Sequence, residues 1–187
     1  MLIVFVGPPG VGKGTQCALL RDRLKLTHLS TGEILRKAIE DKTPLGETAN
    51  KFINDGKLVP DEIMIDLIDE RLFSGNRLGD WLLDGFPRTL PQAVALDNLL
   101  AKHSAKIDVV LELVADHDEV RSRLMQRAKD EGRKDDDPIT VQRRLLIFAK
   151  QTAPIVEHYS NQGVLRKIDG IGTPEEVHQR VLASIDV

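Results

Sequence analysis

The sequence contains a single cysteine, Cys17, among its 187 residues. One cysteine excludes an intramolecular disulfide and any zinc site built from several cysteines, and it fits a reducing compartment. The chain also lacks an apolar run near the ~20 residues that a membrane-spanning helix needs. Its formal net charge of −3 provides no general attraction for nucleic acid. These absences argue against a membrane protein and against a protein that binds nucleic acid.

The first ten residues, MLIVFVGPPG, contain a short apolar stretch without a basic flank or a small-residue cleavage site. They are typical of a first β-strand and not of a signal peptide, so we expect a cytoplasmic protein. With 41% hydrophobic and 29% charged residues, the chain has a globular composition and the length for one domain with a sizeable core. No apolar stripe stands out for self-association, and we expect a monomer.

Short runs of branched apolar residues recur along the chain, separated by segments with helical periodicity. The clear runs are Leu2–Val6, Trp81–Leu83, Val109–Val114 and Val164–Ile168, and a weaker one is Thr27–Leu29. This alternation predicts an α/β fold with a five-stranded parallel sheet and helices on both of its faces.

Three patterns locate helices between these strands. One helix face is formed by Ile63, Met64, Leu67, Ile68 and Leu72, with Asp61 as its candidate cap. Thr173 and Glu176 form a capping-box pattern, and Pro174 takes the first helical position. Residues 31–73 are too many for a plain crossover and contain breaks at Pro44, Gly56 and Pro60, which predicts an inserted helical subdomain.

A glycine-rich segment, Gly-Pro-Pro-Gly-Val-Gly-Lys-Gly-Thr at positions 7–15, joins the first predicted strand to a helix. Glycines let the backbone approach a phosphate with its N–H groups pointing inward, and the helix N-terminus adds partial positive charge. Lys13 can reach the outer phosphates. The hydroxyl that usually follows the lysine comes one place later, at Thr15, because Gly14 stands in its position. The segment predicts a phosphate-binding loop.

Two further segments follow predicted strands. In Leu-Asp-Gly-Phe-Pro-Arg-Thr at positions 83–89, Asp84 comes at the carboxyl end of a strand, the edge where open parallel sheets bind ligands. A carboxylate there can hold the water shell of a magnesium ion, and Arg88 can contact a phosphate with two nitrogens. In Ser-Thr-Gly-Glu-Ile-Leu-Arg at positions 30–36, Ser30 or Thr31 begins a helix, which by itself indicates only a well-capped helix.

Taken together, these segments resemble the adenylate kinase family. The other matching motifs are Gly-Lys-Leu-Val-Pro at positions 56–60 and Gly-Arg-Lys-Asp-Asp at positions 132–136. The match covers essentially the whole chain in order and spacing. The resemblance implies a three-layer P-loop NTPase fold and a Mg²⁺-dependent, reversible phosphoryl transfer from ATP to AMP that gives two ADP.

The resemblance also implies a division of the chain and roles for its residues. The core would be residues 1–29, 60–126 and 138–187, the AMP-binding insertion 30–59, and the lid 127–137, in the short form that has no zinc. ATP would be held by Gly10, Val11, Gly12, Lys13, Gly14, Thr15, Arg123 and Arg127. AMP would be held by Thr31, Arg36, Lys57, Val59, Gly85, Arg88, Gln92, Arg133 and Arg144. The catalytic group would be Lys13, Asp84, Arg88, Arg127, Arg133 and Arg144. Magnesium would be bound through water and phosphates near Asp84 and Thr15, and Asp135 and Asp136 would help to close the lid.

The histidines are not needed for this chemistry. The acceptor is a phosphate whose second pKa near ~6 leaves it mostly dianionic at neutral pH, so no side-chain base is required. The five histidines are scattered without metal-ligand spacing, and we interpret them as structural or surface residues. They are His28, His103, His117, His158 and His178.

Three alternative functions fit parts of the pattern. A UMP/CMP kinase would share the short lid, the loop and the arginines, but Thr31, Thr89 and Gln92 favour adenine over a pyrimidine. A nucleotide-gated switch would need an Asn-Lys-x-Asp guanine motif, which the sequence lacks. A catalytically silent nucleotide-binding protein would not need to keep Lys13 and Asp84.

Overall fold

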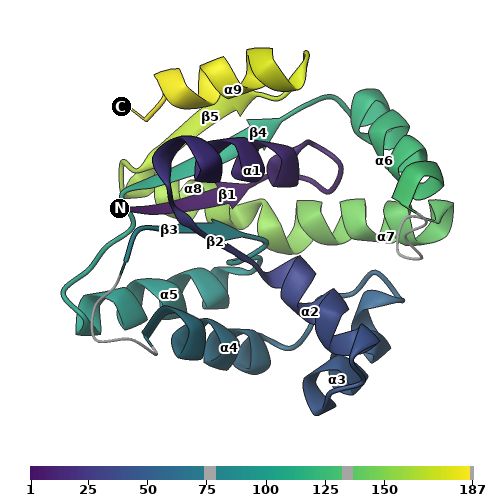
Figure 1. The fold of residues 1–187 in the computed structure, drawn as a ribbon, viewed down its shortest axis with the longest axis horizontal. Coiled ribbons are helices and arrows are strands. Elements are labelled where there is room, and N and C mark those ends of the chain that lie inside the picture. The colour runs from purple at the N-terminus through teal and green to yellow at the C-terminus, as the bar shows by residue number, and fades with distance from the viewer. Residues whose placement is uncertain (74–78, 132–136, 186–187) are drawn as a thin grey trace.

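The structure is a computed structural model that describes residues 1–73, 79–131 and 137–185 (Figure 1). A five-stranded sheet lies at its centre, with the strand order β2-β3-β1-β4-β5. The strands are β1 (Leu2–Val6), β2 (Thr27–Ser30), β3 (Trp81–Asp84), β4 (Val109–Val114) and β5 (Leu165–Asp169). The helices are α1 (Lys13–Leu24), α2 (Thr31–Glu40), α3 (Pro44–Ile53), α4 (Asp61–Phe73), α5 (Leu90–Lys102), α6 (His117–Glu131), α7 (Pro138–Ile147), the π-helix η2 (Phe148–Thr152), α8 (Pro154–Asn161) and α9 (Pro174–Ala183).

All the strand pairs are parallel, which confirms the predicted α/β class and the five-stranded sheet. The observed strands differ from the predicted runs by no more than one residue at an end, as at Asp84 and Asp169. β1 lies in the middle, with Val4 opposite Leu83 of β3 and Val110 of β4. The loop after β1 therefore starts from the centre of the carboxyl edge.

The core consists of two apolar layers, one on each face of the sheet. Along β1, Leu2 and Val4 belong to the layer that α4, α5 and α8 complete, whereas Ile3 and Phe5 belong to the layer that α1, α6 and α9 complete. This alternation follows from the period of two in a strand, and β1 is apolar throughout because both of its faces are covered. Figure 1 shows α1 and α9 on one side of the sheet, and α4 and α5 on the other.

The predicted insertion contains α2 and α3, which lie side by side at one end of the molecule (Figure 1). Ser30 is the N-cap of α2, and its hydroxyl accepts a hydrogen bond from the Glu33 N–H, which settles the choice between Ser30 and Thr31. Pro44 begins α3, as a proline in the first turn of a helix can. The core and insertion boundaries at residues 29/30 and 59/60 stay a prediction.

Two expectations about helix ends have different outcomes. The capping box of α9 is confirmed, since Thr173 and Glu176 exchange hydrogen bonds between side chain and backbone. Asp61 as a cap of α4 is wrong. Asp61 is the first residue of that helix, and its carboxylate accepts hydrogen bonds from Thr89 and Gln92 instead. A capping pattern takes account only of residues close in sequence. Here Thr89 and Gln92, which are distant in sequence, bind the carboxylate instead of the helix N–H groups.

The predicted lid, residues 127–137, begins within α6, which continues to Glu131. Asp137 caps α7 by accepting hydrogen bonds from the backbone N–H groups of Ile139 and Thr140. Arg133, Asp135 and Asp136 lie outside the described residues. Among the residues that the structure does describe, no helix is long and apolar enough to cross a membrane.

Candidate active site

The loop between β1 and α1 has the backbone that close contact with a phosphate requires. Gly10 and Gly12 have φ angles of 83° and 102°, in the left-handed region that side chains disfavour. Gly12 is also the N-cap of α1, and without a side chain it leaves the first N–H groups of the helix open to a ligand. Gly14 and Thr15 are exposed at the start of α1, whereas Val11 is buried.

Lys13 is folded back against this loop. Its Nζ donates hydrogen bonds to the carbonyl oxygens of Gly7 and Pro8, over 2.7 and 2.8 Å. Removal from water lowers the pKa of Lys13 to about 8; the charge of Asp84 opposes this shift, and the charges of Arg88 and Arg144 add to it. Several cations thus act on one another at this loop.

Asp84 ends β3 next to the loop, and its side chain is 15% exposed. A Cβ added at Gly14 would lie 4.0 Å from Oδ2 of Asp84, so the carboxylate faces the first turn of α1. An oxygen donor beside the phosphate loop, with the Thr15 hydroxyl nearby, has the chemistry that Mg²⁺ prefers. These residues therefore fit the metal that the resemblance implies.

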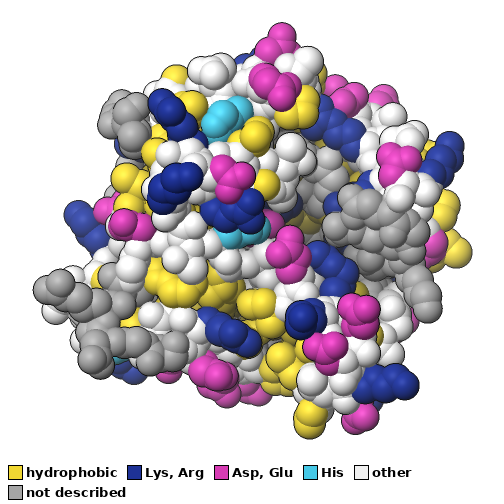
Figure 2. Space-filling view, in the orientation of Figure 1, with side chains coloured by type: hydrophobic (Ala, Val, Ile, Leu, Met, Phe, Trp, Pro, Cys, Tyr) yellow, Lys and Arg dark blue, Asp and Glu magenta, His cyan; other side chains and the backbone are white. Residues whose placement is uncertain are grey.

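A pocket opens beside Lys13, and residues from five parts of the chain form its walls. It is lined by Lys13 together with Thr31, Arg36, Lys57, Val59, Gly85, Arg88, Gln92 and Arg144. These are all the described residues expected to hold AMP. Figure 2 shows a hollow on this side of the molecule, with Lys and Arg side chains along its edge. Segments far apart in sequence are brought together because β1, β2 and β3 end at the same edge of the sheet.

The wall formed by Thr31 and Gly85 is tightly packed. The Thr31 hydroxyl donates a 3.3 Å hydrogen bond to the carbonyl oxygen of Asp84. Gly85 has a φ of 82°, and a Cβ there would lie 2.6 Å from the Thr31 hydroxyl. A side chain at position 85 would therefore push the first turn of α2 out of place.

Gln92 is held by a hydrogen-bond network that fixes the orientation of its side-chain amide. The sequence motifs do not reveal this network. The Gln92 Oε1 accepts from the Arg88 N–H over 2.7 Å, and its Nε2 donates to Asp61 over 2.7 Å. The other carboxylate oxygen of Asp61 accepts from the Thr89 hydroxyl over 3.0 Å. The Gln92 amide is therefore held in one orientation, with one N–H and one lone pair not used by these bonds.

Arg88 is held at the opposite end of the same segment. Its Nε donates to the Gly85 carbonyl oxygen over 2.8 Å, and its own carbonyl oxygen accepts from the Thr152 hydroxyl over 2.8 Å. Thr152 belongs to η2, which also contributes Phe148 to the pocket wall. No sequence pattern pointed to Thr152 or to a role of Asp61 at this pocket, because each bonds a partner distant in the chain.

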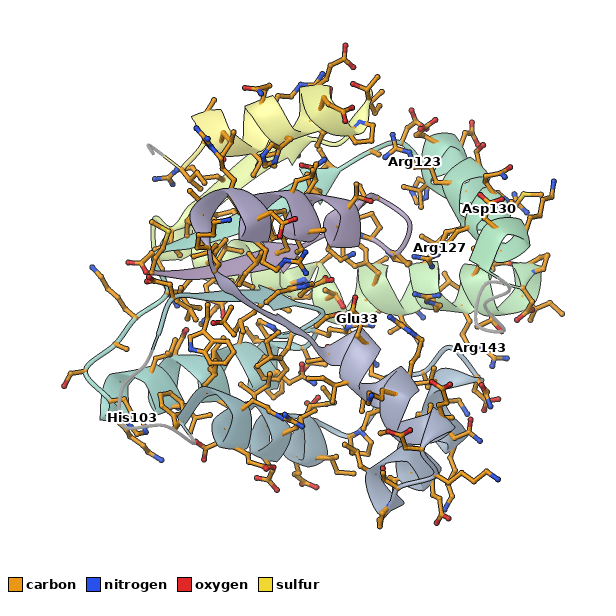
Figure 3. The ribbon with its side chains drawn as sticks, in the orientation of Figure 1. Glu33, His103, Arg123, Arg127, Asp130 and Arg143 are labelled. Atoms are coloured by element: carbon orange, nitrogen blue, oxygen red, sulfur yellow. The ribbon has the colours of Figure 1, made fainter. Side chains whose placement is uncertain are left out.

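Arg123 and Arg127 lie on the side of α6 that faces the phosphate loop (Figure 3). Arg123 pairs with Glu119 over 2.6 Å, and its Nη1 donates to the carbonyl oxygens of Val11 and Gly170, over 3.2 and 3.0 Å. It thus bridges the loop before α1 and the turn after β5. Arg127 is one helical turn further along the same face.

The insertion also contacts α7. Arg143 donates a 2.7 Å hydrogen bond to the Asp55 carbonyl oxygen, and Arg144 lines the pocket from the same helix (Figure 3 labels Arg143). A Cβ at Gly56 would lie 2.9 Å from the methyl group of Thr140, so this contact is close. The end of the predicted insertion is therefore in contact with a helix of the core.

Comparisons with known proteins agree with this geometry. A family profile described as adenylate kinase matches residues 5–164. The chain is 45% identical to an adenylate kinase of Thermobifida fusca, over 99% of this chain and 98% of that protein. It is 43% identical to one of Thermus thermophilus, over 99% of this chain and 97% of that protein. With one of Acidothermus cellulolyticus the identity is 42% over 212 aligned positions, more than the 187 residues of this chain, so that relative has additional residues. The chain belongs to the adenylate kinase family of nucleotide-binding phosphotransferases.

Proposed function

We propose that the pocket beside Lys13 binds AMP, that the loop at residues 7–15 binds the phosphates of ATP, and that Mg²⁺ assists the transfer between them. As a family member, the chain transfers a phosphoryl group from ATP to AMP. The observation that carries the proposed roles is the single cavity that Lys13, Arg36, Arg88 and Arg144 line together. A site for two phosphorylated ligands needs cations in this number.

The AMP role rests on the polar groups of the pocket. Gln92 presents one N–H and one lone pair beside each other, and adenine offers an acceptor next to a donor at its edge. Arg36, Arg88 and Arg144 come from different walls and provide charge for the phosphate of AMP. The packed wall at Thr31 and Gly85 limits the size of the base.

The ATP role rests on the loop and on α6. The backbone N–H groups at the start of α1, together with Lys13, supply the phosphate site. Arg123 is fixed against Val11 and Gly170, where its guanidinium offers a flat surface for the adenine ring. Arg127 lies on the same side of α6 (Figure 3), and we assign it to the phosphates together with Arg133, which we assign from the sequence.

The chemistry needs charge stabilisation and no protein base. Lys13, Arg88 and Arg144 reduce the repulsion between the two polyanions and stabilise the charge that spreads over the moving phosphoryl group. Asp84 and Thr15 would hold the hydrated Mg²⁺, which supplies further positive charge at the transferred group when it is bound. The insertion and the lid would close over the ligands and exclude water, which would otherwise accept the phosphoryl group.

An acceptor panel tests the proposed specificity. Purified protein with Mg²⁺ and ATP is given AMP, UMP or CMP, and nucleoside diphosphate formation is followed in both directions. We expect AMP to react much faster than the pyrimidine nucleotides. Comparable rates with UMP would replace the AMP assignment by the UMP/CMP kinase alternative.

Arg88→Ala tests the proposed site. Because Arg88 faces the reacting phosphates, its loss should lower kcat by about 10²–10³-fold, the cost of one preorganised charge-stabilising donor. Arg21→Ala is the matched control, since Arg21 is exposed outside the pocket and pairs with its neighbour Asp22. A kcat for Arg88→Ala near that of the control would contradict the role of Arg88.

A further inference from the structure

Three side chains of different chemistry meet beneath the first turns of α1. They are Cys17 of α1, His28 of β2 and Asp84 at the end of β3. The Cys17 Sγ, one ring nitrogen of His28 and one oxygen of Asp84 all lie within 4.8 Å of one another. His28 Nε2 is 3.9 Å from Asp84 Oδ2, beyond hydrogen-bond distance. The three positions are far apart in sequence, so residue spacing does not reveal the group.

His28 supplies an independent reason to look for a ligand here. Its side chain is only 10% exposed, yet its buried Nε2 has no hydrogen-bond partner among the described residues. Burying such a nitrogen without a partner costs free energy, and most buried polar atoms in proteins have one. This Nε2 atom lies 3.9 Å from Asp84 Oδ2, so it is on the side of the ring that faces the carboxylate.

We propose that Cys17, His28 and Asp84 form a binding site for one Zn²⁺ ion, or for a divalent metal of similar softness, and that the bound ion inhibits the enzyme. Thiolate, imidazole and carboxylate are the three ligand types that Zn²⁺ accepts, and three protein ligands leave a fourth position for water. Mg²⁺ does not compete well here because it prefers oxygen ligands. The site departs from the expectations that the chain has no zinc and that His28 is only structural.

Zn²⁺ should inhibit because it and the hydrated Mg²⁺ need the same carboxylate, that of Asp84. A carboxylate that coordinates Zn²⁺ cannot hold the water shell of Mg²⁺ as well, so the ion withdraws Asp84 from its proposed role. Metal binding rests only on the three side chains, whereas the inhibition also rests on the proposed function. The two can therefore fail separately.

The site needs small adjustments to take the ion. With Zn–S near 2.3 Å and Zn–N and Zn–O near 2.0–2.2 Å, tetrahedral coordination places the ligand atoms roughly 3.4–3.6 Å apart, closer than they are now. Cys17 must also lose its proton, and burial raises the pKa of its thiol. Binding forms the Zn–S bond, breaks the S–H bond and releases one proton to solvent, so affinity should increase with pH. Asp84 is the most exposed of the three and lies beside the exposed Gly14, so the ion would enter from that side.

Titration with Co²⁺ tests binding without any nucleotide. Co²⁺ takes the place of Zn²⁺ and gives a near-ultraviolet charge-transfer band when a thiolate coordinates it. We expect a band that saturates at one ion per chain. Cys17→Ala should abolish it, and His28→Gln should weaken metal affinity by about 100-fold, at least as much as loss of an outer-shell partner costs. His158→Gln is the matched control, because His158 pairs with Asp97 elsewhere in the fold.

Inhibition is then measured with Mg²⁺ and both nucleotides saturating and with free Zn²⁺ buffered. Cys17→Ala and His28→Gln should keep their activity at Zn²⁺ concentrations that inhibit the wild type and His158→Gln. A missing thiolate band, or a band that survives in Cys17→Ala, would overturn the site. A band without inhibition, or equal inhibition of all four proteins, would overturn the inhibitory role. An inactive wild type in assays that contain Mg²⁺ but no Zn²⁺ would count against the proposed function alone.

Discussion

At the scale of single residues, Lys13 shows how burial and neighbouring charges set the pKa of a group in the site. Burial lowers the pKa of Lys13 to about 8, and the nearby charges of Arg88 and Arg144 push it in the same direction. A bound phosphate does the opposite, because a nearby anion favours the protonated ammonium. The lysine is therefore partly deprotonated in mildly alkaline solution, and nucleotide binding must restore its proton.

The proton count of binding tests this behaviour. In EDTA, without Mg²⁺, ADP binding at pH 9 should take up roughly 0.9 proton per chain, because Lys13 changes from mostly neutral to charged. At pH 6.5 the lysine is already protonated, so its contribution should disappear. Affinity should consequently fall as the pH rises above 8. Calorimetry in two buffers with different ionisation enthalpies measures the uptake, and Lys13→Met, which has no proton to gain, is the control. Equal uptake in the variant would assign the proton to another group.

Asp61 reaches the proposed AMP site through its hydrogen bond with Gln92. Its carboxylate accepts from both Thr89 and Gln92, and Asp61→Ala removes both acceptors. Gln92 then loses its fixed orientation. We expect KM for AMP to increase by about tenfold, the equivalent of one hydrogen bond to a charged group, while kcat changes little.

Steady-state kinetics with AMP and CMP measure this effect, and the preference for AMP over CMP should fall with it. Asp66→Ala is a suitable control, since Asp66 is exposed on the same helix. A drop in kcat with an unchanged KM would show that Asp61 contributes to phosphoryl transfer and not to binding of the base.

At the scale of elements, the insertion depends on one close contact between helices. A Cβ at Gly46 of α3 would lie 1.9 Å from the carbonyl oxygen of Ala38 in α2. Alanine in place of glycine normally stabilises a helix by about 1 kcal/mol. Here the clash should dominate, and overpacking costs typically about 1–3 kcal/mol. Gly46→Ala should therefore loosen α2 and α3 and raise KM for AMP, because Thr31 and Arg36 belong to α2.

Hydrogen exchange resolved along the chain measures the result. Amides of α2 and α3 should lose protection, while those of β1 and β4 keep it. Glu47→Ala, an exposed neighbour in the same helix, should leave protection close to wild type. Increased protection in Gly46→Ala would mean that helix propensity outweighs the contact.

The elements also show what could be read from the sequence. The strands and the phosphate loop were predictable because apolar alternation and glycine spacing are local. The pairs Asp61–Gln92 and Thr152–Arg88, and the meeting of Cys17 with His28, were not, because each needs the strand order before its members become neighbours. Asp61 illustrates the difference, since its local pattern predicted a helix cap and its tertiary partners decided otherwise.

At the scale of the whole molecule, the net charge of −3 gives no sign that cationic side chains gather at one edge of the sheet. Lys13, Arg36, Arg88 and Arg144 line one pocket, so they repel one another wherever no anion separates them. Such clustering gives this edge of the sheet an affinity for phosphates that the net charge does not suggest.

Thermal unfolding with AMP, adenosine and pyrophosphate separates the contribution of the phosphate to binding from that of the base. At a concentration near 100 times its Kd, AMP should add about 2.7 kcal/mol to the free energy of unfolding, and thus raise Tm by roughly 5–10 °C for a chain of this size. Adenosine at the same concentration should raise Tm far less, because it brings no charge to the arginines, and pyrophosphate should raise it without any base. The shifts caused by AMP and pyrophosphate should shrink near 1 M salt, where the Debye length falls to about 3 Å. If adenosine stabilised the chain as much as AMP, base contacts and not the cation cluster would dominate binding.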